Sequence, residues 1–122
     1  MTDSQTTVAR LRQLVEQFVD RREWHQFHTP KNLAMSMAIE TAELMEHFQW
    51  LTPEQSRQLA QEPQKLAAVA DELADVCCYL LAMANELGLD LSAAVEKKMA
   101  KNEAKYPADE YRGRFGPDDP GQ

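Results

Sequence analysis

The amino-acid sequence predicts an all-α protein with a single domain. Apolar residues recur three and four residues apart in several stretches, which is the spacing of one helix face. The strongest pattern runs from residue 64 to residue 87, and Gly88 follows it in the position of a carboxyl-terminal helix cap. With 122 residues the chain is long enough to form one core. We therefore predict a bundle of four to five helices.

The longest predicted helix carries an apolar seam of the coiled-coil kind, which we expect to pack inside the bundle. Glu72, Asp75 and Tyr79 form a parallel stripe one residue before this seam. The seam consists of Leu66, Val69, Leu73, Val76, Leu80, Met83 and Leu87.

The other helices are predicted from apolar spacing and from start signals. Thr29 with Pro30, and Thr52 with Pro53, each combine a capping side chain with proline at the first helical position. The remaining helices are expected over about residues 3–22, 31–50, the short segment between Thr52 and Pro63, and the stretch from Asp90 or Ser92 to Lys105.

The end of the chain differs from the rest in composition. Proline, glycine and charged residues are frequent after residue 107, and this composition predicts a flexible tail over residues 108–122. The domain itself would then span residues 1–107.

Charge and composition narrow the classes of partner. The chain has 20 Asp and Glu against 13 Lys and Arg, which argues against a sequence-independent grip on a nucleic-acid polymer. The first residues lack the basic and apolar regions of a signal peptide, and no apolar run approaches membrane-spanning length. We therefore expect a cytoplasmic protein without a membrane partner.

Cys77 and Cys78 are adjacent, so their side chains diverge on a helix, and we expect them to fill the core.

Two pairs of carboxylates are the most informative feature. Glu40 and Glu43 form one pair, and Glu72 and Asp75 form the other, each at the margin of a predicted apolar face. Residues 32–56 and 66–96 contain no Lys or Arg, so neither pair has a local cation. Cations from another helix could form ordinary salt bridges with these acids, for which the arginines of the first helix are candidates. Alternatively, the two pairs bind Mg²⁺ or Mn²⁺, which prefer carboxylate oxygens.

Two further groups of residues suggest ligand contacts. The linker between the first two helices contains Trp24, Phe27 and His28, which either close the end of the bundle or form an aromatic wall for a planar base, with Asn32 as a second hydrogen-bonding side chain. On the last helix a polar stripe could hold phosphates or could simply face solvent. The stripe consists of Lys98, Asn102 and Lys105.

The acid pairs and the aromatic segments together resemble those of a known family. The two acid pairs resemble the metal signature of the MazG-like all-α nucleoside triphosphate pyrophosphohydrolases. Within that superfamily the chain resembles the dCTP pyrophosphatase branch, and the likeness covers residues 18–107. Residues 51–63 match least. The closer likeness lies in residues 24–33 (WHQFHTPKNL), residues 43–50 (ELMEHFQW), Tyr79, Lys98-Met99 and Tyr106-Pro107.

The resemblance implies hydrolysis of a nucleoside triphosphate between its α and β phosphates, with dCTP or a modified pyrimidine deoxynucleotide as the expected substrate. It also implies a homodimer or homotetramer, in which neighbouring subunits complete the helical bundle and each site. Glu43 is the first candidate for the general base and Glu46 the second. By the same resemblance, Glu40, Glu43, Glu72 and Asp75 would bind Mg²⁺, with Lys31, Lys98, Asn102 and Lys105 on the phosphates and Trp24, His28, Asn32, Trp50 and Tyr79 around the base and sugar.

Two rival functions also use helical carboxylates. A di-iron carboxylate bundle normally has Glu-x-x-His on two helices, and here Glu43 and His47 are four residues apart. A non-catalytic helical dimerisation module would use its acids to bind a basic partner. The absence of cations around both acid pairs argues against such a module. The sequence lacks a phosphate-binding glycine loop, an EF-hand loop and zinc-type spacing of Cys and His.

Overall fold

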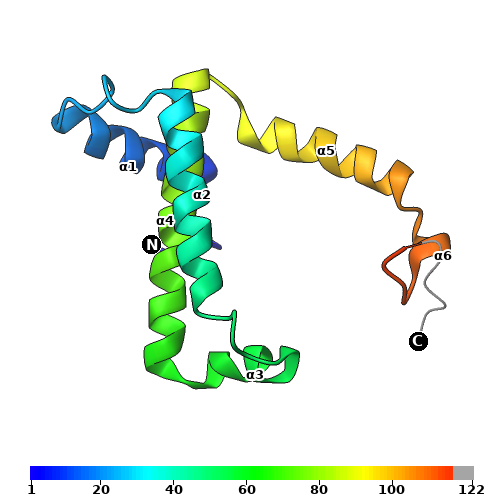
Figure 1. Cartoon of the computed structure of the whole chain (residues 1–122). Helices are drawn as coiled ribbons and strands as arrows, with labels where there is room; N and C mark the ends of the chain where they lie inside the picture. Colours follow the sequence, from blue (N-terminus) through cyan, green and yellow to red (C-terminus); the bar gives the residue numbers. More distant parts are fainter. Residues whose placement is uncertain (117–122) are drawn as a thin grey trace. The chain divides into compact units, whose positions relative to one another are not determined.

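The computed structural model describes residues 1–116, and these residues form helices and connecting turns without a strand (Figure 1). The predicted all-α class is therefore confirmed. The chain divides into two compact units, residues 1–89 and the part that follows from Asp90. The first unit contains α1 (Val8–Arg21), α2 (Pro30–Glu46), α3 (Pro53–Gln58), the 3₁₀ helix η1 (Leu59–Gln61) and α4 (Pro63–Leu87).

In the first unit, α4 is the central element, and both α2 and α1 pack against it. Figure 1 shows α2 and α4 side by side and running in opposite directions, with α3 in the connection between them. The opposite end of α4 lies beside α1, where the Arg12 Nε donates to Asn85 Oδ1 over 2.9 Å and the Asn85 side chain donates back to the Arg12 carbonyl over 3.1 Å. These contacts place α1 beside the carboxyl-terminal end of α4, which also packs against α2.

Short polar side chains begin most of the helices. The hydroxyl of Thr29 accepts a hydrogen bond from the Asn32 amide, and Thr52 forms a reciprocal capping box with Gln55. Both predicted helix starts are therefore confirmed. The first helix begins at Val8 instead of residue 3, because Thr7 caps it. The second helix ends at Glu46 instead of residue 50, where residues 47–50 form a turn.

The end of α4 agrees with the sequence prediction. Gly88 has a φ of 63°, in the left-handed region that glycine adopts without the strain of a Cβ. The amide of Leu89 then donates to the Ala84 carbonyl over 3.0 Å, which satisfies a free carbonyl in the last turn.

The core of the single chain is small, and it does not follow the predicted seam. Of the seam residues only Val69 is buried, while Leu73 and Leu87 are about half exposed. The reason is that α1 and α2 cover a neighbouring face of α4, which carries Leu81 and Ala82. The prediction that Cys77 and Cys78 fill the core is also wrong for the single chain, since both are exposed. The buried apolar residues are Val19, Leu33, Leu59, Val69, Leu81, Ala82 and Ala84.

The second unit contains α5 (Leu91–Lys105) and α6 (Ala108–Tyr111). The side chain of Asp90 accepts from the Ala93 amide over 2.8 Å, so Asp90 is the cap of α5. The helical turn α6 lies within the segment predicted to be a flexible tail, and its Tyr111 ring contacts Tyr106 edge to face at 5.2 Å. Residues 117–122 of that segment lie outside the described residues. No helix within residues 1–116 has the length and apolar content that crossing a bilayer requires.

Leu33 offers a test of the core, because its exposed fraction is only 1%. Leu33→Ala removes buried methyl groups and leaves a cavity, so we expect the free energy of unfolding to fall by about 2–5 kcal/mol. Urea denaturation followed by circular dichroism measures this change. Val8→Ala, at an exposed position on α1, is the control and should change stability by less than about 0.5 kcal/mol. Equal losses in the two variants would contradict the assigned core.

Candidate active site

Three carboxylates from two helices meet between α2 and α4. Glu40 and Glu43 lie one turn apart on α2, and Glu72 lies on α4. One oxygen of each carboxylate lies within 4.8 Å of one oxygen of the others. The packing of α2 against α4 therefore brings together residues that are about thirty positions apart in the sequence.

The carboxylates are not neutralised by basic side chains. Among the ion pairs of residues 1–116, none joins a Lys or Arg to Glu40, Glu43, Glu72 or Asp75. Two of the candidate arginines have other partners: Arg12 donates to the end of α4, and Arg22, the residue after α1, lies over the Phe18 ring at 3.7 Å. The salt-bridge alternative is therefore not realised within the described part of one chain.

Two oxygens of the cluster lack any hydrogen-bond partner although they are shielded from solvent. These are Oε2 of Glu40 and Oε2 of Glu72. Buried carboxylate oxygens are costly unless a donor or a cation satisfies them. The nearest basic group to Glu72 is His47, whose Nε2 lies 3.9 Å from Oε1, beyond hydrogen-bonding distance. Oxygen donors of this kind fit a hard divalent cation such as Mg²⁺ or Mn²⁺.

The pKa of Glu40 reflects this crowding. Burial, and after it the neighbouring carboxylates of Glu43, Asp75 and Glu72, together raise the pKa of its carboxyl to about 7. The cause is that a further negative charge is opposed both by loss of water and by neighbouring carboxylates. A bound divalent cation reverses both effects, so the same residues that repel one another would bind it together.

The other two acidic candidates lie at the margin of the cluster. Asp75 is exposed and is not one of the three carboxylates that meet within 4.8 Å, but its charge acts on Glu40. Glu46 is the last residue of α2 and is exposed. Its position one turn beyond Glu43 leaves it near the end of the helix instead of inside the cluster.

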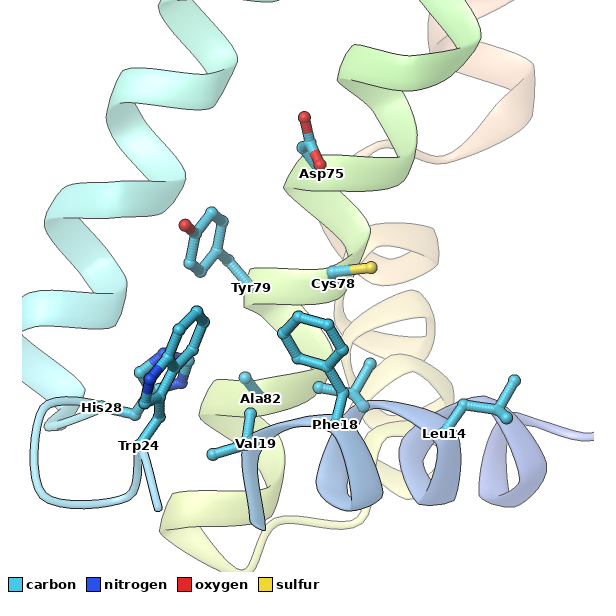
Figure 2. A pocket seen from close by; sticks show the side chains of 10 residues that line it. Leu14, Phe18, Val19, Trp24, His28, Asp75, Cys78, Tyr79 and Ala82 are labelled. Carbon is cyan, nitrogen blue, oxygen red and sulfur yellow. The ribbon is translucent and has the colours of Figure 1, made fainter. Parts of the chain in front are cut away.

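Asp75, whose charge acts on Glu40, also lines a cavity of about 450 Å³ (Figure 2). Its size lies in the range of small-ligand sites in proteins. In Figure 2, Asp75 and Tyr79 extend from α4, Phe18 and Val19 from α1, and Trp24 lies with His28 at the turn before α2. The lining residues are Leu14, Val15, Phe18, Val19, Trp24, His28, Asp75, Cys78, Tyr79 and Ala82.

The contribution of α1 to this cavity was missed from the sequence. Leu14, Val15 and Phe18 belong to the apolar residues whose helical spacing predicts the first helix. In the structure Phe18 is 48% exposed and faces the cavity. Helical spacing identifies an apolar face but does not distinguish a face packed against protein from one that lines a cavity.

The aromatic side chains of the cavity are held by one another. The rings of Phe18 and Trp24 meet edge to face at 5.7 Å, and the Trp24 ring lies 6.0 Å from that of His28. The Nδ1 of His28 is shielded from solvent and has no hydrogen-bond partner. This nitrogen is therefore available to a polar group of a ligand, while the rings offer flat apolar surfaces.

Other residues predicted for substrate binding lie outside this cavity. The side chain of Asn32 donates to the Phe27 carbonyl over 3.0 Å and so braces the turn. Lys31 is exposed, and Trp50, which follows α2, is 86% exposed and is not among the lining residues. The predicted phosphate ligands Lys98, Asn102 and Lys105 all lie on α5, in the second unit.

Comparison with known proteins gives a consistent relationship. The MazG-like family is matched over residues 35–114. The chain is 39% identical over 110 residues to dCTP pyrophosphatase 1 of Bos taurus, covering 90% of this chain and 65% of the relative. It is 40% identical over 102 residues to dCTP pyrophosphatase 1 of Homo sapiens, covering 84% of this chain and 60% of the relative. The chain thus spans less than two thirds of the length of these relatives.

A solved crystal structure is similar to this chain over nearly the whole length of the solved protein. The crystal structure of a pyrophosphatase from Archaeoglobus fulgidus superposes with a TM-score of 0.74 at 38% sequence identity. The match covers 88% of this chain and 98% of the archaeal chain. At this identity the similarity extends beyond the general arrangement of helices.

Removing one charge from the cluster separates repulsion from metal binding. We expect Glu40→Gln to raise the melting temperature in EDTA, because it relieves repulsion with Glu43 and Glu72. Wild-type protein at a Mg²⁺ concentration one hundred times its Kd should gain about 2.7 kcal/mol, and the variant much less. Differential scanning fluorimetry with and without Mg²⁺ measures both effects. Glu54→Gln on α3 is the matched control and should behave as wild type.

Proposed function

The chain belongs to the MazG-like family, and we propose that it hydrolyses nucleoside triphosphates to a monophosphate and pyrophosphate. The relatives named dCTP pyrophosphatase 1 and the archaeal pyrophosphatase support this assignment. The proposal concerns this chain alone, since it spans only part of the curated relatives.

One observation carries the proposal: within the first unit, Asp75 connects a cavity lined by aromatic residues with the cluster of carboxylates. Asp75 lines the cavity and acts electrostatically on Glu40. A nucleotide has the matching arrangement, with a flat base at one end and an anionic polyphosphate at the other. The base would lie between the aromatic rings, and the phosphates would point towards the carboxylates through a divalent cation.

We assign Glu40, Glu43, Glu72 and Asp75 as the residues that would hold Mg²⁺ or Mn²⁺. The support is the meeting of three carboxylates and the two buried oxygens without partners. When bound, the cation would neutralise phosphate charge and make a coordinated water more acidic.

The chemical step needs a group that accepts a proton. The water oxygen bonds to the α phosphorus, the bond from that phosphorus to the bridging oxygen breaks, and pyrophosphate leaves. We propose Glu43 as the acceptor of the water's proton, because it is the exposed member of the cluster and can reach a ligand. Glu46 is the second candidate, one turn further along α2.

The remaining predicted residues are assigned to binding. Trp24, His28 and Tyr79 would hold the base and sugar, supported by their place in the cavity wall. Asn32 would act on this pocket through the turn that it braces. Lys31 and the α5 residues Lys98, Asn102 and Lys105 would bind phosphates, and Trp50 would complete the base pocket.

For the substrate we propose dCTP or a modified pyrimidine deoxynucleotide. The support is the similarity to dCTP pyrophosphatase 1 from several mammals, including Bos taurus and Homo sapiens. Removal of such nucleotides would serve housecleaning of the nucleotide pool, which fits the cytoplasmic location that we predict.

We also propose that the chain forms a homodimer or homotetramer. The predicted seam on α4 remains largely uncovered in one chain, and the exposed fractions of Leu66, Leu73, Leu80 and Leu87 lie between 38% and 53%. Apolar faces of this extent are typical of interfaces. A second chain would cover the seam.

The rival function, a non-catalytic dimerisation module, shares this feature but gives no reason for the carboxylate oxygens without partners.

Pyrophosphate release tests the proposed reaction. We expect release from nucleoside triphosphates in Mg²⁺ and none in EDTA, with the highest kcat/KM for one pyrimidine deoxynucleotide in a panel of deoxy and ribo substrates. Glu43→Gln should lower kcat/KM by about 100-fold or more, because it removes both a metal ligand and the proposed base. Glu54→Gln is the control. Folded wild-type protein that releases no pyrophosphate from any nucleotide would contradict the proposal.

Mixing two defective variants tests whether neighbouring chains share a site. If Trp50 completes the site of another chain, Trp50→Ala and Glu43→Gln chains mixed through unfolding and refolding should form heterodimers with one intact site. About a quarter of the sites would then be active by random pairing. An assay of each variant alone and of the mixture measures this recovery. Activity equal to the mean of the two separate variants would instead place Trp50 and Glu43 of one chain in the same site.

A further inference from the structure

His25 lies outside the proposed catalytic cluster, yet it connects three segments of the first unit. Its Nδ1 lies 2.5 Å from Oε1 of Glu86 on α4, and its Nε2 lies 2.9 Å from Oε1 of Glu16 on α1. Asp20, also on α1, lies 3.9 Å from the same Nε2. His25 itself belongs to the turn that joins α1 to α2.

These distances define the protonation state that the arrangement favours. Neutral imidazole has one N–H donor, whereas each ring nitrogen of His25 faces a carboxylate that only accepts. Both contacts are satisfied together only by the imidazolium form. A neutral ring would leave one nitrogen lone pair against a negative oxygen of Glu16 or Glu86.

The pKa of His25 is consistent with this geometry. The hydrogen bond with Glu86 is the largest influence and raises the pKa above 6.5, partial burial opposes it, and the charges of Glu16 and Glu86 raise it again. Because the folded-state value is the higher one, the stabilisation from this contact is complete below pH 6.5. It is lost as the pH rises through the raised value.

The turn that carries His25 also carries two aromatic residues of the cavity. We call residues 23–28 the aromatic turn. The amide of Trp24 donates to the Val19 carbonyl over 3.1 Å, and the His28 amide donates to the Trp24 carbonyl over 3.0 Å. The turn includes Glu23 at a φ of 53°, a backbone conformation that is unfavourable for a side chain other than glycine. Contacts outside the turn must therefore hold it, and those of His25 reach both α1 and α4.

We propose that His25, held as an imidazolium between α1 and α4, is a positioning residue that fixes the aromatic turn against the cavity. The proposal rests on the proposed function, because it takes this cavity as the nucleotide site. Deprotonation of His25 loosens the aromatic turn and weakens binding of the base. It does not move the carboxylates that act on the phosphates. KM should therefore depend on His25 more than kcat does.

The first test needs no turnover. Proton–nitrogen NMR of the imidazole rings should give His25 a pKa above 6.5 in the wild type and a lower one in Glu86→Gln. In a Trp50→Phe background, which leaves Trp24 as the only tryptophan, acrylamide quenching of its fluorescence should increase as the pH rises from 6 to 8.5. Titration of His25 at its ordinary pKa, or quenching that does not change with pH, would overturn the proposal.

The second test measures nucleotide kinetics across the same pH range. In the wild type, KM should rise roughly two- to fivefold from pH 6 to 8.5, the factor expected for one partly exposed ion pair. The KM of His25→Gln should exceed the wild-type KM most at pH 6 and approach it at pH 8.5, so that titration of Glu40, which both proteins share, cancels from the ratio; kcat should follow the wild-type profile. Glu54→Gln, an exposed acid on α3, is the control for loss of charge and should keep the wild-type profile of KM.

The two tests separate this inference from the proposed function. Glu86→Gln replaces His25→Gln if the latter does not fold, and its KM should begin to rise at lower pH. An active enzyme whose KM profile is the same in the wild type and in both variants overturns the role of His25 alone. Absence of turnover overturns the proposed function, whereas the NMR and fluorescence results still decide whether His25 clamps the turn.

Discussion

The packing of α2 against α4 is the constraint on which the rest of the structure depends. It places Glu40 and Glu43 opposite Glu72 and leaves the α1 side of α4 to form a cavity. Because the carboxylates lie on regular helices, their positions are fixed by backbone hydrogen bonds instead of by loops. The same packing forces like charges together, so the geometry that would suit a divalent cation is unfavourable without one.

The core of the single chain is too small to offset much repulsion among the clustered carboxylates. Seven apolar residues of the described chain are buried, and large apolar side chains on α4 remain exposed. A second chain would add the apolar burial that this chain lacks and would do so along the seam, away from the face that packs against α1. Stability and the proposed active site would then depend on different faces of α4. Burial of the seam could offset the repulsion among the carboxylates.

Sequence reasoning identified what depends on local spacing. The caps at Thr29, Thr52 and Gly88 were predictable, because each is defined by a few neighbouring residues. The face of α4 that α1 and α2 cover within one chain was not predicted, since every face of a long apolar helix suits a partner and only the fold selects one. The walls of the cavity depend on how α1 crosses α4, and the spacing within α1 contains no information about that crossing. The roles of Arg12 and His25 were missed for the same reason.

Polar contacts hold α1 against α4, because much of the apolar face of α1 lines the cavity. Because Leu14, Val15 and Phe18 line the cavity, little of that face is available for packing, and Val19 is the only residue of α1 that is buried. Polar contacts therefore connect α1 to α4. Arg12 binds Asn85 and the Leu89 carbonyl, and His25 joins Glu16 to Glu86. A planar ligand against Phe18 and Trp24 would supply the missing apolar contact, so ligand binding and the position of α1 should be coupled. Such coupling follows from thermodynamic linkage, since a ligand that binds one position of α1 more tightly also stabilises that position.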